Sequence, residues 1–66
     1  MVIGGFSIKD EGYGLSVKEH EAGWAFWLQG EDAERFREEW DVWQEARPNC
    51  GFRDFLRSYE YDSLFQ

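Results

Sequence analysis

The stretch that decides the fold is EDAERFREEWDVWQEAR, which runs from Glu31 to Arg47. Its large apolar residues recur at intervals of three or four, the repeat that places side chains on one face of an α-helix. A helix that is apolar along one side only has to cover another apolar surface. We therefore predict that the preceding residues form a sheet beneath it. The inner stripe of this helix consists of Ala33, Phe36, Trp40 and Trp43.

The opposite side of the same helix is strongly acidic. Residues 31–45 hold seven of the fourteen acids and two of the seven basic residues, so they carry −5 of the total charge of −7. At about 100° per residue, four of these acids fall within roughly 60° of one another, opposite the inner stripe. Two further acids stand at the start of the helix. These six residues form what we call the acidic row and are the candidate partner-binding residues: Glu31, Asp32, Glu34, Glu38, Asp41 and Glu45.

The acidic row is not the arrangement that helix stability alone would favour. Like charges four residues apart repel by about 0.2–0.5 kcal/mol per pair, and Glu34–Glu38 and Asp41–Glu45 are such pairs. Two arginines can offset part of this repulsion by forming ion pairs with acids of the same helix. The intrahelical ion pairs that we expect are Glu31–Arg35 and Arg37–Asp41.

Charge density suggests what the acidic row could bind. Seven acids over about 21 Å of helix give one per roughly 3 Å, which is comparable to the one phosphate per about 3.4 Å of a DNA strand. Such a helix can compete with DNA for a groove lined with Lys and Arg. The net charge of −7 argues against direct binding to nucleic acid or to anionic membranes, because both would repel it. The alternative is an ordinary solvated face that keeps an aromatic-rich protein in solution.

The first thirty residues have the period-two alternation of β-strands. We predict strands at residues 2–9, 13–19 and 24–29, joined by short turns that favour an antiparallel meander. One face of this sheet is apolar, and Trp27 points to the other face. The residues expected on the apolar face are Val2, Phe6, Ile8, Tyr13, Leu15, Val17, Trp24, Phe26 and Leu28.

Pro48 is expected to end the first helix, because the residue before a proline is disfavoured in the α region, and a second helix is predicted after it. Asn49 is expected to cap it, and Asp32 or Glu31 to cap the first helix. Val42 and Ala46 lie beside the inner stripe, where the second helix could meet them. Its own apolar face comprises Phe52, Phe55, Leu56 and Tyr59.

These elements predict one α+β domain over residues 1–66. A three-stranded antiparallel sheet is covered on one face by two α-helices, at about 32–46 and 50–61. The tail, residues 61–66, is apolar enough to pack back onto the core, although it could also fray. We expect a monomer.

No pattern in the chain is typical of an enzyme. His20 and Cys50 are the only residues of their kinds, and neither has a partner nearby in the sequence to form a nucleophile–base pair. The chain has no phosphate-binding loop and no metal-ligand spacing. We therefore predict no catalytic residues, no metal and no cofactor. A lone thiol suits a reducing cytosol, and no signal peptide or bilayer-spanning stretch is present.

In length, charge and the order βββαα, and in the acidic segment EDAERFREEWDVWQEAR, the chain resembles the small acidic anti-CRISPR proteins of phages and other mobile elements. The resemblance is to the type I inhibitors that act as DNA mimics, and among these to type I-C. It implies a non-enzymatic inhibitor in the host bacterial cytoplasm that binds a type I CRISPR–Cas surveillance complex. The acidic row would then face Lys and Arg of the Cas subunit that grips duplex DNA, and so block target binding.

A different class of function stays open. The chain could be a small phage or plasmid regulator, or an antitoxin-like module, that binds one basic or apolar protein partner. Trp27 is the residue that would distinguish this alternative, because it is a large aromatic side chain on the sheet face away from the predicted helices. It could equally be a surface aromatic shielded by its neighbours, or a dimer contact.

Overall fold

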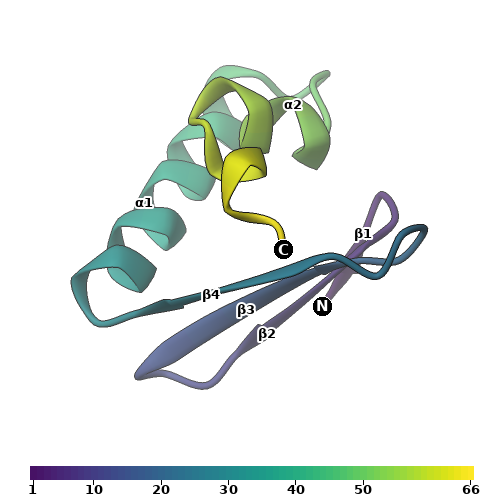
Figure 1. The fold of residues 1–66 in the computed structure, drawn as a ribbon. Coiled ribbons are helices and arrows are strands. Elements are labelled where there is room, and N and C mark those ends of the chain that lie inside the picture. The colour runs from purple at the N-terminus through teal and green to yellow at the C-terminus, as the bar shows by residue number, and fades with distance from the viewer.

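Four antiparallel strands in the order β1-β2-β3-β4 form a sheet, and the helices lie on one face of it (Figure 1). The computed structural model describes all residues, 1–66. The predicted α+β class, with an antiparallel sheet and two α-helices, is confirmed. The elements are β1 (Val2–Ile3), β2 (Phe6–Asp10), β3 (Gly14–Glu19), β4 (Ala25–Gln29), α1 (Glu31–Ala46), α2 (Phe52–Ser58) and the 3-10 helix η1 (Tyr61–Leu64).

The prediction of three strands was wrong, because residues 2–9 form a hairpin and not one strand. Gly4 and Gly5 have positive φ angles of 50° and 87°, the backbone region that a two-residue hairpin turn requires and that glycine adopts freely. The turn folds β1 back against β2, with Val2 opposite Ser7. Val2 consequently faces solvent, with 71% of its surface exposed.

The inner face of β2, β3 and β4 follows the predicted alternation. Two residues expected there lie elsewhere. Tyr13 belongs to the turn before β3, where its N–H donates to Glu11 O at 3.0 Å, and it is 67% exposed. Trp24 precedes β4 and is exposed as well. The buried residues of the sheet are Phe6, Ile8, Leu15, Val17, Phe26 and Leu28.

Helix α1 buries its inner stripe as predicted, with Trp40 half-buried and the other three members fully buried. It begins at Glu31, and Gly30 stands at its cap position without any side-chain cap, so the expected capping by Asp32 or Glu31 was wrong. The predicted flank was also wrong, since Val42 is 59% exposed and Ala46 is exposed too. Helix α2 instead folds back over the stripe itself.

Helix α2 is shorter than the predicted 50–61. Gly51, and not Asn49, occupies its cap position, and the helix ends before Tyr59. The reason is Glu60, whose φ of 63° is left-handed and redirects the chain into η1. Phe52, Phe55 and Leu56 are buried as predicted, whereas the C-cap residue Tyr59 is partly exposed.

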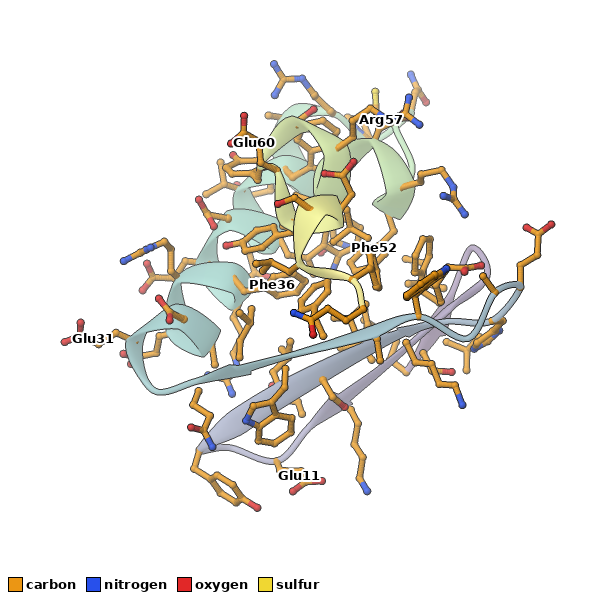
Figure 2. All side chains as sticks on the ribbon, in the orientation of Figure 1. Glu11, Glu31, Phe36, Phe52, Arg57 and Glu60 are labelled. Carbon is orange, nitrogen blue, oxygen red and sulfur yellow. The ribbon has the colours of Figure 1, made fainter.

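Phe36 lies at the centre of the core, between α2, β4 and the tail (Figure 2). Its ring centroid is 6.2 Å from that of Phe26 in β4, 5.3 Å from that of Phe55 in α2 and 4.9 Å from that of Tyr61 in η1. All three contacts are edge-to-face, the geometry that the charge distribution of aromatic rings favours. One side chain therefore joins three parts of the fold.

The C-terminal segment packs back onto the core, which is the first of the two outcomes expected for residues 61–66. Phe65 stacks on Phe6 and meets Phe26 edge-on, with centroids 6.1 and 4.9 Å apart. The main chain of Gln66 pairs with Ala25 in β4, with N···O distances of 3.1 and 3.2 Å. None of the helices is long and apolar enough to cross a membrane.

A polar contact ties α1 to the turn between β2 and β3. Arg37 donates from Nε and Nη2 to the two carboxylate oxygens of Asp10, both at 2.7 Å, and from Nη2 to Gly12 O at 2.9 Å. Asp10 also accepts from the Gly12 N–H at 2.9 Å. The hydrogen bonds from Arg37 and Gly12 lower the pKa of Asp10 from 3.8 to about 2.

Replacing Phe36 should remove the central core contact. We expect Phe36→Ala to cost about 3–5 kcal/mol of unfolding free energy, as large aromatic-to-alanine changes do. That is a large share of the stability of so small a domain. Val42→Ala on the same helix is the matched control and should cost less than about 0.5 kcal/mol. Urea unfolding followed by circular dichroism measures both, and equal losses would contradict this packing.

The contact between Asp10 and Arg37 should make stability depend on pH. A carboxyl group with a lowered pKa stabilises the fold above its unfolded pKa, and this is lost as pH falls through the folded value. Asp10→Asn should therefore lower the urea midpoint at pH 7, and the difference from wild type should shrink as pH falls from about 4 towards 2. Glu21→Gln, at an exposed turn position, is the control. A difference that stays the same at pH 7 and pH 2.5 would show that the ion pair does not stabilise the fold.

Candidate functional site

All six residues of the acidic row are exposed, and four of them, Glu34, Glu38, Asp41 and Glu45, follow the outer side of α1. Packing of the inner stripe fixes this orientation: Ala33, Phe36 and Trp43 are buried against the rest of the core, so the helix cannot rotate about its axis. Figure 2 shows Glu31 projecting into solvent at the start of α1, away from the sheet. Five of the six predicted residues thus share the outer surface of α1, whereas Asp32 turns towards the sheet and lines a hollow with Phe26 and Leu28 of β4.

The arginines of α1 do not neutralise the acidic row as expected. Arg37 forms an ion pair with Asp10, 27 positions earlier in the chain, and the predicted pair of Arg37 with Asp41 is absent. Arg35 approaches Asp32 at 3.8 Å and does not pair with Glu31. Both partners of that contact are well exposed, and such an ion pair contributes little. Glu34, Glu38, Asp41 and Glu45 have no ion pair at all.

Glu39, the seventh acid of the segment, has a structural role and is not part of the acidic row. It is half-buried and accepts a hydrogen bond from the hydroxyl of Tyr61. Burial of the phenol, together with this hydrogen bond to Glu39, raises the pKa of Tyr61. Glu39 therefore holds η1 against α1.

The remaining arginines lie at the opposite end of the helical layer from the start of α1. Arg47 covers the ring of Trp43 at 4.8 Å, and Arg53 covers that of Phe6 at 5.0 Å. Arg57 projects from the top of α2 (Figure 2). None of the three forms an ion pair. These cations therefore lie away from the outer face of α1, and acids lie close to Arg53 and Arg57.

A second exposed feature lies on the open face of the sheet. Trp27 is 43% exposed on the face that the sequence predicted, and its ring meets that of Tyr13 at a centroid distance of 6.4 Å. The indole lies over Gly14, where an added Cβ would come within 2.4 Å of it. Tyr13, which was predicted on the apolar face, belongs to this surface instead. The glycines on both sides of Tyr13 were the available signal that it belongs to a turn.

His20 and Cys50 do not form a catalytic pair. The ring of His20 is hydrogen-bonded to Ser7 in β2, while Cys50 is exposed in the connection between α1 and α2, so it is not a core residue. No group of three or more His, Cys, Asp or Glu side chains is placed to hold a metal ion.

An open groove of about 540 Å³ separates α2 from the turn between β3 and β4. Trp24, Arg53 and Arg57 line it together with the acids Glu19, Glu21 and Asp62. Opposite charges thus face the same space, and the groove presents no group of one sign that would select a charged ligand.

Comparison of this chain with protein-family models, with curated proteins and with solved structures found no match.

Proposed function

We propose that this chain is a non-enzymatic inhibitor that binds a type I CRISPR–Cas surveillance complex through the acidic row. The row would occupy the surface with which a Cas subunit grips duplex DNA, and so prevent target binding. The observation that carries this proposal is the pairing of Arg37 with Asp10, which leaves the four carboxylates of the outer helix face, Glu34, Glu38, Asp41 and Glu45, without an ion pair. The inhibitor would act in the cytoplasm of the host bacterium.

The physical basis of such binding is electrostatic. Carboxylates fixed on a helix that cannot rotate present their charge without a large ordering cost, which favours affinity. A dense row of one sign also attracts a basic groove over a distance and speeds association. Salt screens this attraction, since the Debye length falls from about 10 Å at 0.1 M to about 3 Å at 1 M.

Reversal of three central charges should abolish inhibition. The triple variant Glu34→Lys, Glu38→Lys and Asp41→Lys changes only exposed positions, so it should stay folded by circular dichroism. We expect its affinity for the surveillance complex to fall at least a hundredfold, and its block of target DNA binding to disappear in a gel-shift assay.

The matched control changes the net charge by the same amount elsewhere. Glu21→Lys, Glu60→Lys and Asp62→Lys alter three exposed acids outside α1, and this variant should still inhibit. Wild-type association should also weaken as salt is raised. If the folded α1 variant inhibits as well as wild type, the acidic row is not the binding site.

A second candidate function is that of a small phage or plasmid regulator, or antitoxin-like module, that binds its partner through an apolar patch. The exposed pair Tyr13 and Trp27 favours it, because two large aromatic side chains meet on the uncovered face of the sheet. Exposed aromatic residues of this kind are frequent anchors of protein interfaces.

Trp27→Ala separates the two candidate functions. Under the inhibitor proposal it should change affinity for the surveillance complex less than about threefold, which corresponds to under 1 kcal/mol. Trp27→Phe, which keeps an aromatic ring, controls for loss of the cover over Gly14. Loss of partner binding in a folded Trp27→Ala protein, with full binding by the acid-reversal variant, would favour the regulator.

A further inference from the structure

Strand β4 is an edge strand whose outer side is open for part of its length. It pairs with β3 on one side only. On the other side, the N–H of Ala25 donates to Gln66 O and the N–H of Gln66 donates to Ala25 O. The N–H and C=O of Ala25 therefore face away from β3. Because backbone groups alternate along an antiparallel strand, those of Trp27 and Gln29 face away as well. The bond from Gly30 N to Tyr13 O, at 3.1 Å, fits the same alternation.

Two N–H and two C=O groups of β4 therefore have no partner within the chain. Soluble proteins usually protect such an edge with a charged residue, a proline or a bulge. The strand, Ala25-Phe26-Trp27-Leu28-Gln29, contains none of these. The opposite edge of the sheet is β1, which is only two residues long.

Space for an added strand lies directly beside β4. A hollow of about 580 Å³ follows the strand, and the tail closes one end of it. Its apolar lining includes Phe26, Leu28 and Leu64, and its one charged residue is Asp32 at the start of α1. An extended segment laid here would find backbone partners on one side and an apolar wall with one carboxylate on the other.

We propose that β4 binds an extended, basic segment of a partner protein as a fifth strand of the sheet. Main-chain hydrogen bonds to Trp27 and Gln29 would hold it, as in other cases of strand addition. Alternate side chains of the segment would point to the helical side, where an apolar residue meets Leu64 and a Lys or Arg meets Asp32. This inference uses the main chain of β4 and does not rest on the proposed function of the acidic row.

Charge decides between a basic partner and a second copy of this chain. Pairing two β4 edges would bring together two proteins that each carry a net charge of −7, with Asp32 of each near the shared strand pair. Repulsion disfavours that arrangement. A basic segment gains from the same charges that oppose self-association.

The test uses a blocked octapeptide, Thr-Val-Thr-Lys-Thr-Val-Thr-Lys, added to the full chain labelled with ¹⁵N. As a strand it presents valine and lysine by turns on one face, as the contacts with Leu64 and Asp32 require. We expect the amide hydrogens of Trp27 and Gln29 to exchange at least tenfold more slowly when the peptide is bound. The amides of Phe26 and Leu28, which already face β3, should change little. The same peptide with glutamate in place of each lysine should not bind.

Two substitutions locate the contact. Gln29→Pro removes an outward N–H that β3 does not use, and proline is tolerated on an edge, so peptide affinity should fall about tenfold. Gln29→Thr keeps the N–H and is the matched control. Asp32→Asn should weaken binding about threefold, whereas Glu38→Gln, farther along α1, should not.

A peptide with alternate amides N-methylated tests the same pairing without changing the protein. It keeps its charge but cannot pair along the edge, and it should lose binding. The proposal is overturned if the unmodified peptide does not bind at millimolar concentration. It is equally overturned if the peptide binds without slowing exchange at Trp27 and Gln29, or if the N-methylated peptide binds as tightly.

Discussion

The ring of Phe36 contacts β4, α2 and η1. The positions of these three elements therefore depend on one another through this one side chain. A chain of 66 residues has little interior, and this one has a single cysteine, so no disulfide within the chain can supplement its core. Aromatic side chains compensate, because each can bury about 150–250 Å². Trp40 and Trp43 extend the same cluster along α1 to Phe52 and Phe55.

This core has a direct consequence for the outer surface. Once the inner stripe fixes the rotation of α1, every residue on its opposite side must face solvent. The helix carries four like charges there with no ion pair, although repulsion between them costs free energy. Arg37 could have reduced that repulsion, but it joins α1 to Asp10. Arg37 therefore stabilises the packing of α1 on the turn between β2 and β3, and the four acids on the outer side of α1 have no ion pair.

Helical periodicity predicted more of this structure than strand periodicity did. The buried residues of α1 follow from a repeat that runs from Ala33 to Trp43 within a helix of sixteen residues, too long to arise from a turn. Alternation of period two is less restrictive. The two-residue turn at Gly4 and Gly5 places Ile3, and not Val2, on the same face as Phe6. The two glycines have no side chains that would reveal this change of face in the sequence. For the same reason Tyr13 was placed on the inner face, although the turn includes it.

Local contacts that depend on tertiary geometry could not be predicted in the same way. Asp10 and Arg37 are 27 residues apart, and only the meander and the helix direction bring them together. The expected helix caps failed because Gly30 links β4 to α1 with a φ of 56°, which leaves no room for a capping residue between the two elements. Helix α2 ended early because Glu60 turns the chain so that Tyr61 can reach Phe36.

The tight link at Gly30 also explains why the two proposed surfaces adjoin. Helix α1 begins one residue after β4 ends, so the first acids of the row stand at the end of the edge strand. Asp32 belongs to both surfaces, since it is a member of the acidic row and lines the hollow beside β4. A partner with a basic groove and an extended basic segment could therefore engage main-chain and carboxylate groups within one continuous interface. Complementary charge would guide the encounter, and strand pairing would fix its register.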